Sequence, residues 1–302
     1  MKEASVGARP LQGLTIVVTG SRRAGEQSAL ISNLGGTPYV VPTVGITPTA
    51  DDSAVEPFLK SVIAGVDYAV FMTGPGVQAL AVAAERLGKK GELLGALRSG
   101  RTVVVARSGK PKGVLTKLGV TVHSVPPLDQ STAKGIVEIL KRRGVRGKTV
   151  AVLWHGSRDG WVKAELEKYG AERVVECSVY EYSRELDAGG AGVLSSLGFN
   201  PQAPSHDAVV RLVREIVSGE RSIDAVTFTS PPAARNFFEA AREAGVEKDL
   251  REALNKKTVV VVGDSTREVV EGRGVRVSVM PKVPGMGAMV SALADHVRKG
   301  AR

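Results

Sequence analysis

Hydroxyl-bearing and basic residues follow a series of short apolar runs, and they are the residues best suited to chemistry. Thr19, Ser21 and Arg22 follow the run TIVV. Hydroxyls donate hydrogen bonds to carboxylates, and a nearby guanidinium adds positive charge. The same residue types recur after later apolar runs, at Thr73 and Gly74, at Arg107, Ser108 and Lys110, at His155, Gly156, Ser157 and Arg158, at Thr229 and Ser230, and at Gly263, Ser265 and Thr266. The pattern indicates that the chain binds an anion.

Each of these hydroxyls also has a structural explanation, because Ser and Thr in front of a helix commonly cap its first turn. Their recurrence in both halves of the chain favours a binding role for some of them. Free backbone N–H groups and the positive end of the helix dipole lie at the same turns. If several helix ends faced one cleft, a ligand bearing many carboxylates would suit it.

Stronger catalytic signatures are absent from the sequence. There is no Walker loop and no GxGxxG motif, because PGMGAM, which starts at Pro284, lacks a third glycine at the required spacing. The only cysteine, Cys177, has no evident general base and is expected to be a small apolar filler. We expect no metal and no redox cofactor, because zinc-site spacing is missing from the four histidines, His123, His155, His206 and His296.

The composition is that of a globular protein with an acidic partner. Of 302 residues, 43% are hydrophobic and 24% are charged, and the net charge of +10 attracts anions. The basic run at 141–148 could contact phosphate but is typical of a solvated turn, so nucleic acid is not the favoured partner. The sequence shows neither a signal peptide nor an apolar run of about 18 residues, which predicts a cytoplasmic protein outside the membrane.

The elements that position these turns are predicted to be successive βα units. Each unit is a β-branched run, a small polar turn and a helical pattern, which is typical of a parallel sheet flanked by helices. Ligands bind beyond the carboxyl ends of the strands in such sheets. The units begin at TIVVTGSRR, DYAVFMTGPG, TVVVARSGK, TVAVLWHGSRD, DAVTFTSPP and TVVVVGDST.

The two halves of the chain repeat one pattern. The segment that starts at Asp67 matches the segment that starts at Asp224. Thr102, which opens the next unit, lies 35 residues after Asp67, and Thr258 lies 34 residues after Asp224. Since the chain is also about twice the usual domain length of roughly 150 residues, two similar α/β lobes are expected.

Two extended stretches, 37–48 and 173–186, lie outside this repeat and are interpreted as linker strands because they are rich in Val, Thr and Tyr. Two paths of the chain remain open. Two domains could follow in series with a boundary near 144–148, or the chain could leave lobe one, build lobe two and return. Residues 187–206, rich in Gly, Pro and Ser, are expected to form a surface loop.

Over nearly its whole length the sequence resembles the uroporphyrinogen-III synthase family. The resemblance is carried by TIVVTGSRR with Glu26-Gln27, FMTGPGVQAL, FTSPPAARNF, VVGDSTREV, the tyrosine of SVYEYS and PGMGAMVSAL. It implies two α/β lobes with parallel sheets flanked by helices, joined by a two-stranded ladder. Lobe one would comprise 1–44 and 185–302, lobe two 49–176, and the linker strands 37–48 and 173–186.

The resemblance also implies a reaction without a cofactor. The family closes hydroxymethylbilane, an open chain of four pyrroles with eight carboxylates, by inverting the last ring and losing water. Electron-rich pyrroles supply the reactivity, so the protein acts mainly by positioning a flexible substrate. A monomer is expected.

The site residues follow from the same resemblance. Tyr180 matches a tyrosine thought to assist departure of the hydroxyl, with Tyr182 as the fallback. Gly20 and Ser21 intervene where the family has Arg-Pro, so the choice between Arg22 and Arg23 stays open, and Gly74 replaces a usual serine. The residues implied to bind substrate are Thr19, Arg22, Thr73, Ser108, Ser157, Ser230, Gly263, Ser265 and Thr266.

Two other classes of function remain open. A non-catalytic module that senses tetrapyrroles or acts with DNA in regulation would suit the basic surplus. A two-lobed solute binder of the periplasmic type is disfavoured because the sequence shows no export signal.

Overall fold

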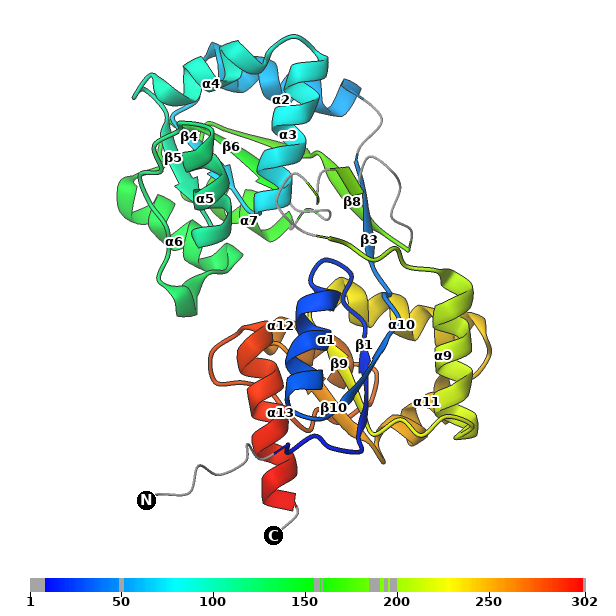
Figure 1. Cartoon of the computed structure of the whole chain (residues 1–302). Coiled ribbons are helices and arrows are strands. Elements are labelled where there is room, and N and C mark those ends of the chain that lie inside the picture. The colour runs from blue at the N-terminus through cyan, green and yellow to red at the C-terminus, as the bar shows by residue number, and fades with distance from the viewer. Residues whose placement is uncertain are drawn as a thin grey trace, which may run out of the picture. The chain divides into compact units, whose positions relative to one another are not determined.

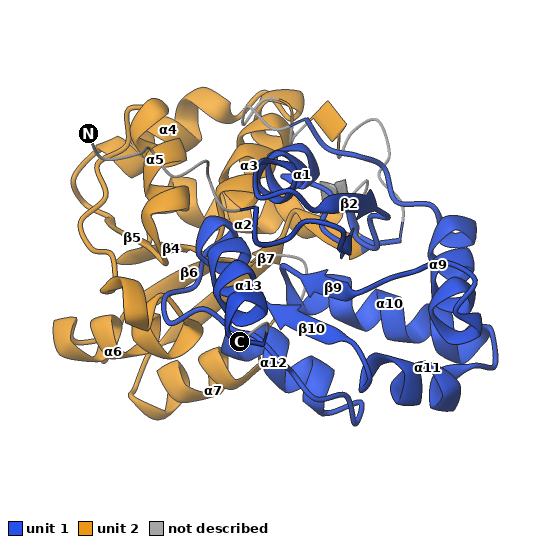
Figure 2. Ribbon diagram, turned by 60° about the horizontal axis from the view of Figure 1, so that its bottom comes forward, with its two compact units in different colours: residues 1–45, 183–187, 199–302 blue, residues 46–182, 188–198 orange. Residues whose placement is uncertain are grey.

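The computed structural model of the chain describes residues 9–48, 52–154, 158, 160–184, 191–192, 195 and 200–300 (Figure 1). The chain divides into two compact units (Figure 2). Unit 1 comprises residues 1–45, 183–187 and 199–302, and unit 2 comprises residues 46–182 and 188–198.

Unit 1 is a parallel four-stranded sheet between two helical layers. The strand order is β10-β9-β1-β2, so the first strand of the chain lies inside the sheet. Because side chains alternate along a strand, Ile16 and Val18 pack with α1 and α13, and Val17 packs with α9 and α10. The elements are β1 (Thr15–Val18), α1 (Ala24–Asn33), β2 (Thr37–Val40), α9 (His206–Ser218), β9 (Ala225–Phe228), α10 (Pro231–Glu243), α11 (Glu247–Leu254), β10 (Thr258–Val261), α12 (Asp264–Glu271) and α13 (Met286–Gly300).

Unit 2 repeats this architecture with the strand order β5-β4-β6-β7, again all parallel. Tyr68 and Val70 of β4 pack with α6 and α7 on one face of its sheet. The elements are α2 (Asp52–Ala64), β4 (Tyr68–Phe71), α3 (Gly74–Arg86), α4 (Lys90–Arg98), β5 (Val103–Ala106), α5 (Gly109–Lys117), α6 (Ala133–Arg143), β6 (Thr149–Trp154), α7 (Gly160–Lys168) and β7 (Arg173–Ser178). The predicted fold class, parallel sheets flanked by helices, is confirmed.

The internal repeat is visible in the pairing of the strands. In sheet order, β5-β4-β6-β7 of unit 2 correspond to β10-β9-β1-β2 of unit 1. Each sheet also has one isolated parallel bridge at the same edge, Val105 with Ser124 and Val260 with Val279. The two units are therefore equivalent position by position, which allows one to serve as a reference for the other.

The interpretation of 37–48 and 173–186 as linkers was too broad. Thr37–Val40 pairs with β1 and Arg173–Ser178 pairs with β6, so each is the fourth strand of a sheet. The sequence did not predict these sheet strands because both contain polar and half-buried residues, and edge strands lack a long apolar run. The later halves pair with each other as a separate ladder of β3 (Gly45–Pro48) and β8 (Tyr180–Ser183).

An aspartate fixes the start of the central strand in each unit. The backbone N–H of Thr15 donates to Oδ2 of Asp224 at 2.8 Å, and the N–H of Thr149 donates to Oδ2 of Asp67 at 2.8 Å. Asp67 also pairs with Lys148. Burial raises the pKa of the Asp67 carboxyl, but the hydrogen bonds from Lys148 and Thr149 outweigh it and leave the pKa below its usual value.

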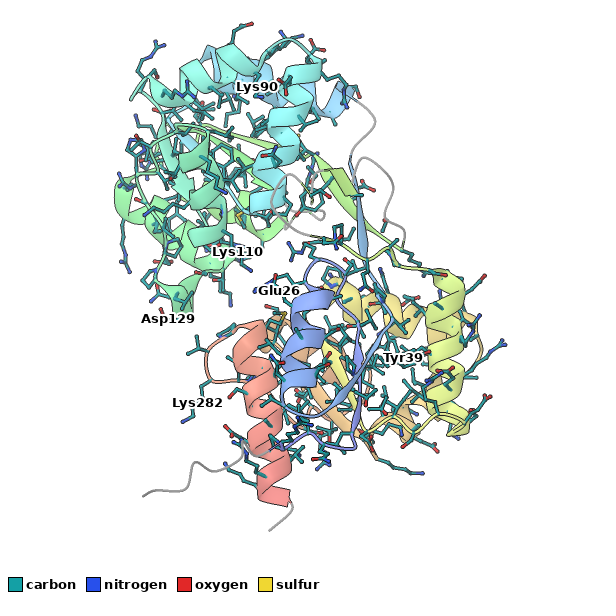
Figure 3. The ribbon with its side chains drawn as sticks, viewed as in Figure 1. Glu26, Tyr39, Lys90, Lys110, Asp129 and Lys282 are labelled. Atoms are coloured by element: carbon teal, nitrogen blue, oxygen red, sulfur yellow. The ribbon has the colours of Figure 1, made fainter. Side chains whose placement is uncertain are left out.

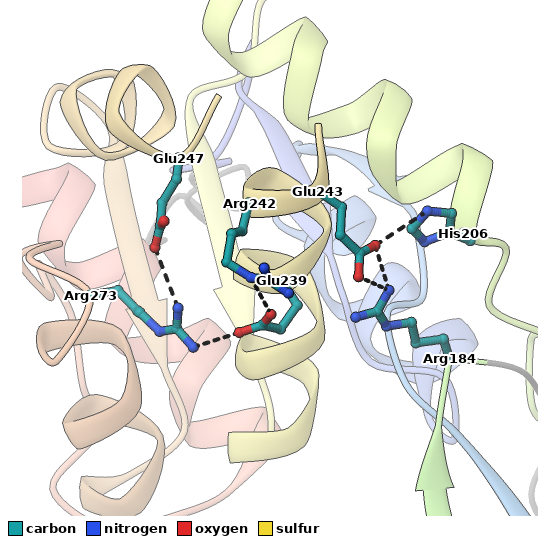
Figure 4. A network of polar contacts seen from close by, with 7 residues as sticks. All are labelled: Arg184, His206, Glu239, Arg242, Glu243, Glu247 and Arg273. Atoms are coloured by element: carbon teal, nitrogen blue, oxygen red, sulfur yellow. Dashed lines mark hydrogen bonds and ion pairs between the residues drawn. The ribbon is translucent and has the colours of Figure 1, made fainter. Parts of the chain in front are cut away.

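A salt bridge between Arg184 and Glu243 fastens the segment that follows β8 to α10 of unit 1 (Figure 4). Nη1 of Arg184 lies 2.8 and 2.6 Å from the two carboxylate oxygens of Glu243 on α10, and Nε2 of His206 lies 3.6 Å from Oε2 of Glu243. The hydrogen bond from Arg184 holds the pKa of the Glu243 carboxyl below its usual range. The chain therefore re-enters unit 1 at a fixed point on α10.

We expect Asp67→Asn to lower the free energy of unfolding by about 1 kcal/mol at pH 7, because the amide loses the ion pair and the side chain is partly exposed. A carboxyl whose folded pKa is depressed stabilises the protein above its unfolded pKa of about 3.9, and the stabilisation disappears as the pH falls through the folded value. Urea unfolding of the native protein and the variant at pH 7 and pH 3 measures the loss of unfolding free energy and its dependence on pH. An equal loss at the two pH values would contradict this assignment.

Candidate functional site

The carboxyl ends of the strands carry the turns that the sequence analysis singled out. In unit 1 the chain runs from β1 to its neighbour β2 on one side and from β9 to its neighbour β10 on the other. The adjacent ends of β1 and β9 are thus a topological switch point, the place where open α/β sheets bind ligands. In unit 2 the ends of β6 and β4 hold the equivalent position.

The two strand ends in unit 1 approach each other closely at Gly20. A Cβ atom on Gly20 would lie 2.6 Å from Oγ1 of Thr229, closer than side-chain atoms pack. A larger residue at this position would have to displace the Thr229 side chain. Ser21 is buried beside this contact, and Arg22 is half-buried one residue further along.

Thr19 takes part in hydrogen bonds that join β1 to β9 beneath this turn. It is fully buried, and its hydroxyl donates to the carbonyl of Thr227 at 2.7 Å. The Thr227 hydroxyl in turn donates to the carbonyl of Val17 and accepts from Nε2 of Gln27, at 2.7 and 2.8 Å. The hydroxyl of Thr19 is thus committed to holding β1 against β9.

A second buried threonine, Thr43, links these hydrogen-bonded strands to α10. The Thr43 hydroxyl donates to the carbonyl of Ala233 at 2.8 Å, and the side-chain amide of Asn236 donates to the carbonyl of Thr43 at 2.8 Å. We did not single out Gln27, Thr43, Thr227 or Asn236 as site residues from the sequence. The sequence did contain one signal for them. Each is a polar residue at a position that the strand or helix period predicts to be buried.

The start of α10 offers few donors to an anion. Ser230 caps the helix by accepting from the N–H of Ala233 at 3.3 Å, and Pro231 and Pro232 have no N–H. The backbone N–H of Ala234 donates to the carbonyl of Ser230. An anion at this turn would be bound by the Ser230 hydroxyl rather than by the helix end.

The start of α12 is more open. Gly263 is its N-cap and has no side chain, so the first N–H groups of the helix have no capping partner there. Ser265 is exposed, whereas Thr266 is buried and its N–H donates to the carbonyl of Gly263. Asp264 pairs with Arg267 at 2.8 Å, which neutralises its charge beside the turn.

The structure distinguishes the two arginines after β1. Arg23 forms an ion pair with Glu26, which Figure 3 shows on α1, and this pair raises the pKa of the guanidinium. Arg22 has no carboxylate partner among the residues that the structure describes. Arg22 is therefore the better candidate for a charged contact with a ligand.

In unit 2, Tyr180 lies at the equivalent strand ends. Its hydroxyl is 3.0 Å from Oγ1 of Thr73, and the ring is 1% exposed. Thr73 caps α3 by accepting from the N–H of Gly76 at 3.1 Å. Cε1 of Tyr180 would lie 3.7 Å from a Cβ atom on Gly76, so the first turn of α3 holds the phenol in place.

The other predicted residues of unit 2 are placed less tightly. Ser108 is the N-cap of α5, but its side chain makes no capping hydrogen bond. Lys110, in the first turn of α5, is exposed (Figure 3). Ser157, with His155 and Gly156, lies outside the described residues. Tyr182 packs edge-to-face on Tyr180, with ring centroids 5.8 Å apart.

Cys177 has the surroundings expected of a filler. Its side chain is buried, Sγ lies 3.5 Å from the carbonyl of Ala54, and burial raises the pKa of the thiol to about 11. The neutral thiol is a poor nucleophile. Within the described parts of the chain, no group of three His, Cys, Asp or Glu residues could hold a metal ion, and no helix is long and apolar enough to cross a membrane.

Comparison with known proteins gives the family. The profile of the family HEM4, described as "Uroporphyrinogen-III synthase HemD", matches residues 25–291. The chain belongs to the uroporphyrinogen-III synthase family. The predicted resemblance is thereby confirmed.

Two sequence relatives span almost the whole chain. YjjA of Bacillus subtilis, an uncharacterized protein, is 30% identical over 288 residues, which are 95% of this chain and 97% of YjjA. A putative uroporphyrinogen-III synthase of Methanothermobacter thermautotrophicus is 27% identical over 274 residues, 90% of this chain and 94% of that protein. Family membership thus covers both units.

Solved structures support the fold. A mutant uroporphyrinogen III synthase of Thermus thermophilus matches with a TM-score of 0.67 at 23% identity, over 95% of this chain and 100% of that one. The wild-type enzyme of the same bacterium, in another crystal form, matches with a TM-score of 0.52 at 23% identity, over 96% and 100%. At these identities the likeness establishes the fold of the family.

We expect Gly20→Ala to destabilise the protein by about 1–3 kcal/mol, because the added methyl group displaces Thr229 and the turn. Gly25→Ala is the matched control, since Gly25 is exposed in α1 with open space around it. That variant should be neutral or more stable by up to about 1 kcal/mol. Thermal or urea unfolding compares the two, and equal effects would show that the close approach at Gly20 is unimportant.

Proposed function

We propose that this chain is a uroporphyrinogen-III synthase, which closes hydroxymethylbilane with inversion of the last pyrrole ring and loss of water. The observation that carries the proposal is the family match over residues 25–291. The placement of a tyrosine and of helix starts without a side-chain cap at the strand ends supports it. We infer that the enzyme works as a cytoplasmic monomer without a cofactor.

The reaction needs a leaving group and a controlled geometry. The terminal hydroxyl takes a proton and leaves as water, and the electrons of its pyrrole form an azafulvene. The substituted α-carbon of the last ring attacks the exocyclic methylene carbon of the azafulvene, which gives a spiro intermediate. This intermediate then fragments and closes again with the last ring inverted. Each step uses the electrons of the pyrroles, so the protein contributes orientation and one proton.

Tyr180 is the proposed catalytic residue, and Thr73 is proposed to position it. A phenol has a pKa of about 10, so Tyr180 acts as a hydrogen-bond donor to the departing hydroxyl rather than as a strong acid. Thr73 accepts from Gly76, which leaves its own proton free to orient the Tyr180 oxygen. Tyr182, packed on the same ring, remains the fallback.

The carboxylates of the substrate are proposed to bind at the turns after the strands. Arg22, Ser230, Gly263 and Ser265 serve this role in unit 1, and Ser108 and Ser157 serve it in unit 2. The hydroxyl of Thr19 donates to the carbonyl of Thr227 and the N–H of Thr266 donates to the carbonyl of Gly263, so we assign both residues to holding the turns in shape rather than to direct contact. Backbone N–H groups and hydroxyls bind carboxylates without a fixed positive charge.

Product isomer analysis tests the proposal. Purified protein supplied with fresh hydroxymethylbilane should give mainly the type III macrocycle, whereas the spontaneous reaction gives type I. Formation of type I alone, with the protein still binding tetrapyrrole carboxylates, would replace the proposal with a sensing role. Formation of type I with binding of DNA would point to a DNA-associated regulator.

Tyr180→Phe is expected to slow type III formation by about 10²-fold without abolishing it, because positioning remains. Thr73→Val should cost about tenfold in kcat and little in KM, because it removes one hydrogen bond to the phenol. The matched control is Thr132→Val, which removes the equivalent cap of α6.

The double variant separates catalysis from stability. If Thr73 acts through Tyr180, Thr73→Val should have no further effect on kcat in the Tyr180→Phe background. An additional tenfold loss there, or an equal loss in Thr132→Val, would show that Thr73 serves only as a helix cap.

A further inference from the structure

Basic residues gather where the strands of unit 2 begin, at the end of its sheet opposite to the proposed active-site turns. The basic run at 141–148 ends α6, forms a turn and leads into β6. Arg173 opens the neighbouring strand β7, where it pairs in register with Thr149 of β6. The exposed arginines of this edge, which we call the Arg146 surface, are Arg142, Arg143, Arg146 and Arg173.

Carboxylates neutralise the lysines of this edge but not its arginines. Lys141 pairs with Glu138 at 2.9 Å, and Lys148 pairs with Asp67 at 2.9 Å. In the part of the chain that the structure describes, no arginine of the Arg146 surface forms an ion pair with a carboxylate. Four guanidinium charges therefore remain beside Glu172, an exposed acidic neighbour.

Hydrogen bonds fix the turn that carries these arginines. The Tyr68 hydroxyl donates to the carbonyl of Gly144 at 2.9 Å. Nε and Nη2 of Arg143 donate to Oγ of Ser124 at 3.1 and 2.8 Å, and this neutral acceptor leaves the charge of the guanidinium in place. The backbone of the turn and one of its guanidinium groups are thus placed before a ligand binds, which reduces the ordering that binding costs.

Unit 1 has the same turn before its own central strand. The N–H of Leu14 donates to the carbonyl of Leu11 at 3.1 Å, and the N–H of Lys148 donates to the carbonyl of Val145 at 3.0 Å. The residue before the donor is in each case a glycine with a positive φ. The backbone of this turn therefore forms in the same way in both units.

The arginines belong to unit 2 alone. Gln12 takes the place of Arg146, and Thr37 opens the strand of unit 1 that corresponds to the strand opened by Arg173. Since the same backbone forms without these charges, the fold does not require them, and like charges close together repel one another. The sequence alone made a solvated turn the simpler interpretation, but the comparison with unit 1 favours a binding role.

Arginine suits one class of anion particularly well. Its planar guanidinium donates two parallel hydrogen bonds to a phosphate, whereas a lysine acts as a point charge. A double-stranded nucleic acid presents one phosphate charge per roughly 1.7 Å of its axis, so several arginines on one surface can contact it together.

The aromatic and apolar residues argue against two other partners. Single-stranded nucleic acids stack their bases on open aromatic rings, but Nζ of Lys141 covers the ring of Tyr169 at this edge, 4.3 Å from its centroid. Membrane surfaces are usually bound with the help of exposed apolar side chains. The large exposed apolar side chains of the described residues lie elsewhere, at Val82, Leu128, Trp161 and Val283.

We propose that the Arg146 surface binds the phosphodiester backbone of a double-stranded nucleic acid. The contacts are made to phosphates, so binding does not depend on the base sequence. The surface shares no residue with the proposed active site, and the proposal therefore does not rest on the proposed reaction.

Fluorescence anisotropy of labelled duplexes of random sequence tests the proposal on the full chain at a series of salt concentrations. Contacts from four arginines predict that the logarithm of the binding constant falls with the logarithm of the salt concentration with a slope of about −3 to −4. A DNA duplex and an RNA duplex are compared, and the tighter one identifies the source of the phosphates. Failure of both to bind would overturn the proposal, as would equally tight binding of polyglutamate or of vesicles containing phosphatidylserine.

The double variant Arg142→Gln/Arg146→Gln tests the surface itself. It should weaken duplex binding about tenfold and make the salt slope shallower by about 2, because two phosphate contacts are lost. The matched control is Arg211→Gln/Arg214→Gln on α9 of unit 1, which removes two exposed arginines that likewise lack an ion pair within the described residues. Equal weakening in both double variants would show a general effect of net charge and contradict the proposal.

Turnover separates this proposal from the enzymatic one. Formation of the type III macrocycle should be unchanged in Arg142→Gln/Arg146→Gln, because these arginines lie at the opposite end of the sheet from the proposed active-site turns. Failure of the nucleic-acid proposal is thus seen in the binding assay, and failure of the enzymatic proposal is seen in product analysis. Unaltered duplex affinity and salt slope in a double variant with the native unfolding midpoint would refute the surface.

Discussion

The hydrogen bond from the backbone of Thr15 to the carboxylate of Asp224 joins residues 209 positions apart, and the architecture of unit 1 depends on the strand pairing that it fixes. With it, β1 lies beside β9 and the turns after both strands meet at Gly20 and Thr229. Unit 2 uses Asp67 and Thr149 in the same way. A shift of register by one residue would turn Ile16 and Val18 to the other face of the sheet, so the aspartate and the apolar alternation specify the same pairing.

Buried polar groups extend this constraint to the strand ends. Thr19, Thr43 and Thr227 donate their hydroxyl protons to backbone carbonyls, and Gln27 donates to the Thr227 hydroxyl. Because buried donors without partners are costly, this set holds the turn after β1 in one arrangement. In the proposed reaction, positioning lowers most of the barrier, so rigid turns are what the protein would have to supply.

The sequence predicted the strands, the repeat and the turns, because β-branched runs and the paired segments at Asp67 and Asp224 are local patterns. It did not identify β2 and β7 as sheet strands, because edge strands carry too few apolar residues to be told from a linker. It also could not separate binding hydroxyls from buried ones: Thr19 and Ser265 both follow a strand, yet only the fold buries the first and exposes the second. The preference for Arg22 over Arg23 rests on the ion pair with Glu26, which depends on where α1 begins.

We propose that the turns after the strands bind the carboxylates of a flexible linear tetrapyrrole. The most direct test of this proposal is amide chemical-shift mapping with a bilane that lacks the terminal hydroxyl and so does not react. We expect shifts at residues 19–22, 229–230 and 263–266 of unit 1 and at 73–76 and 108–110 of unit 2. Shifts confined to the strand starts, at 14–15, 66–68 and 223–225, would contradict it.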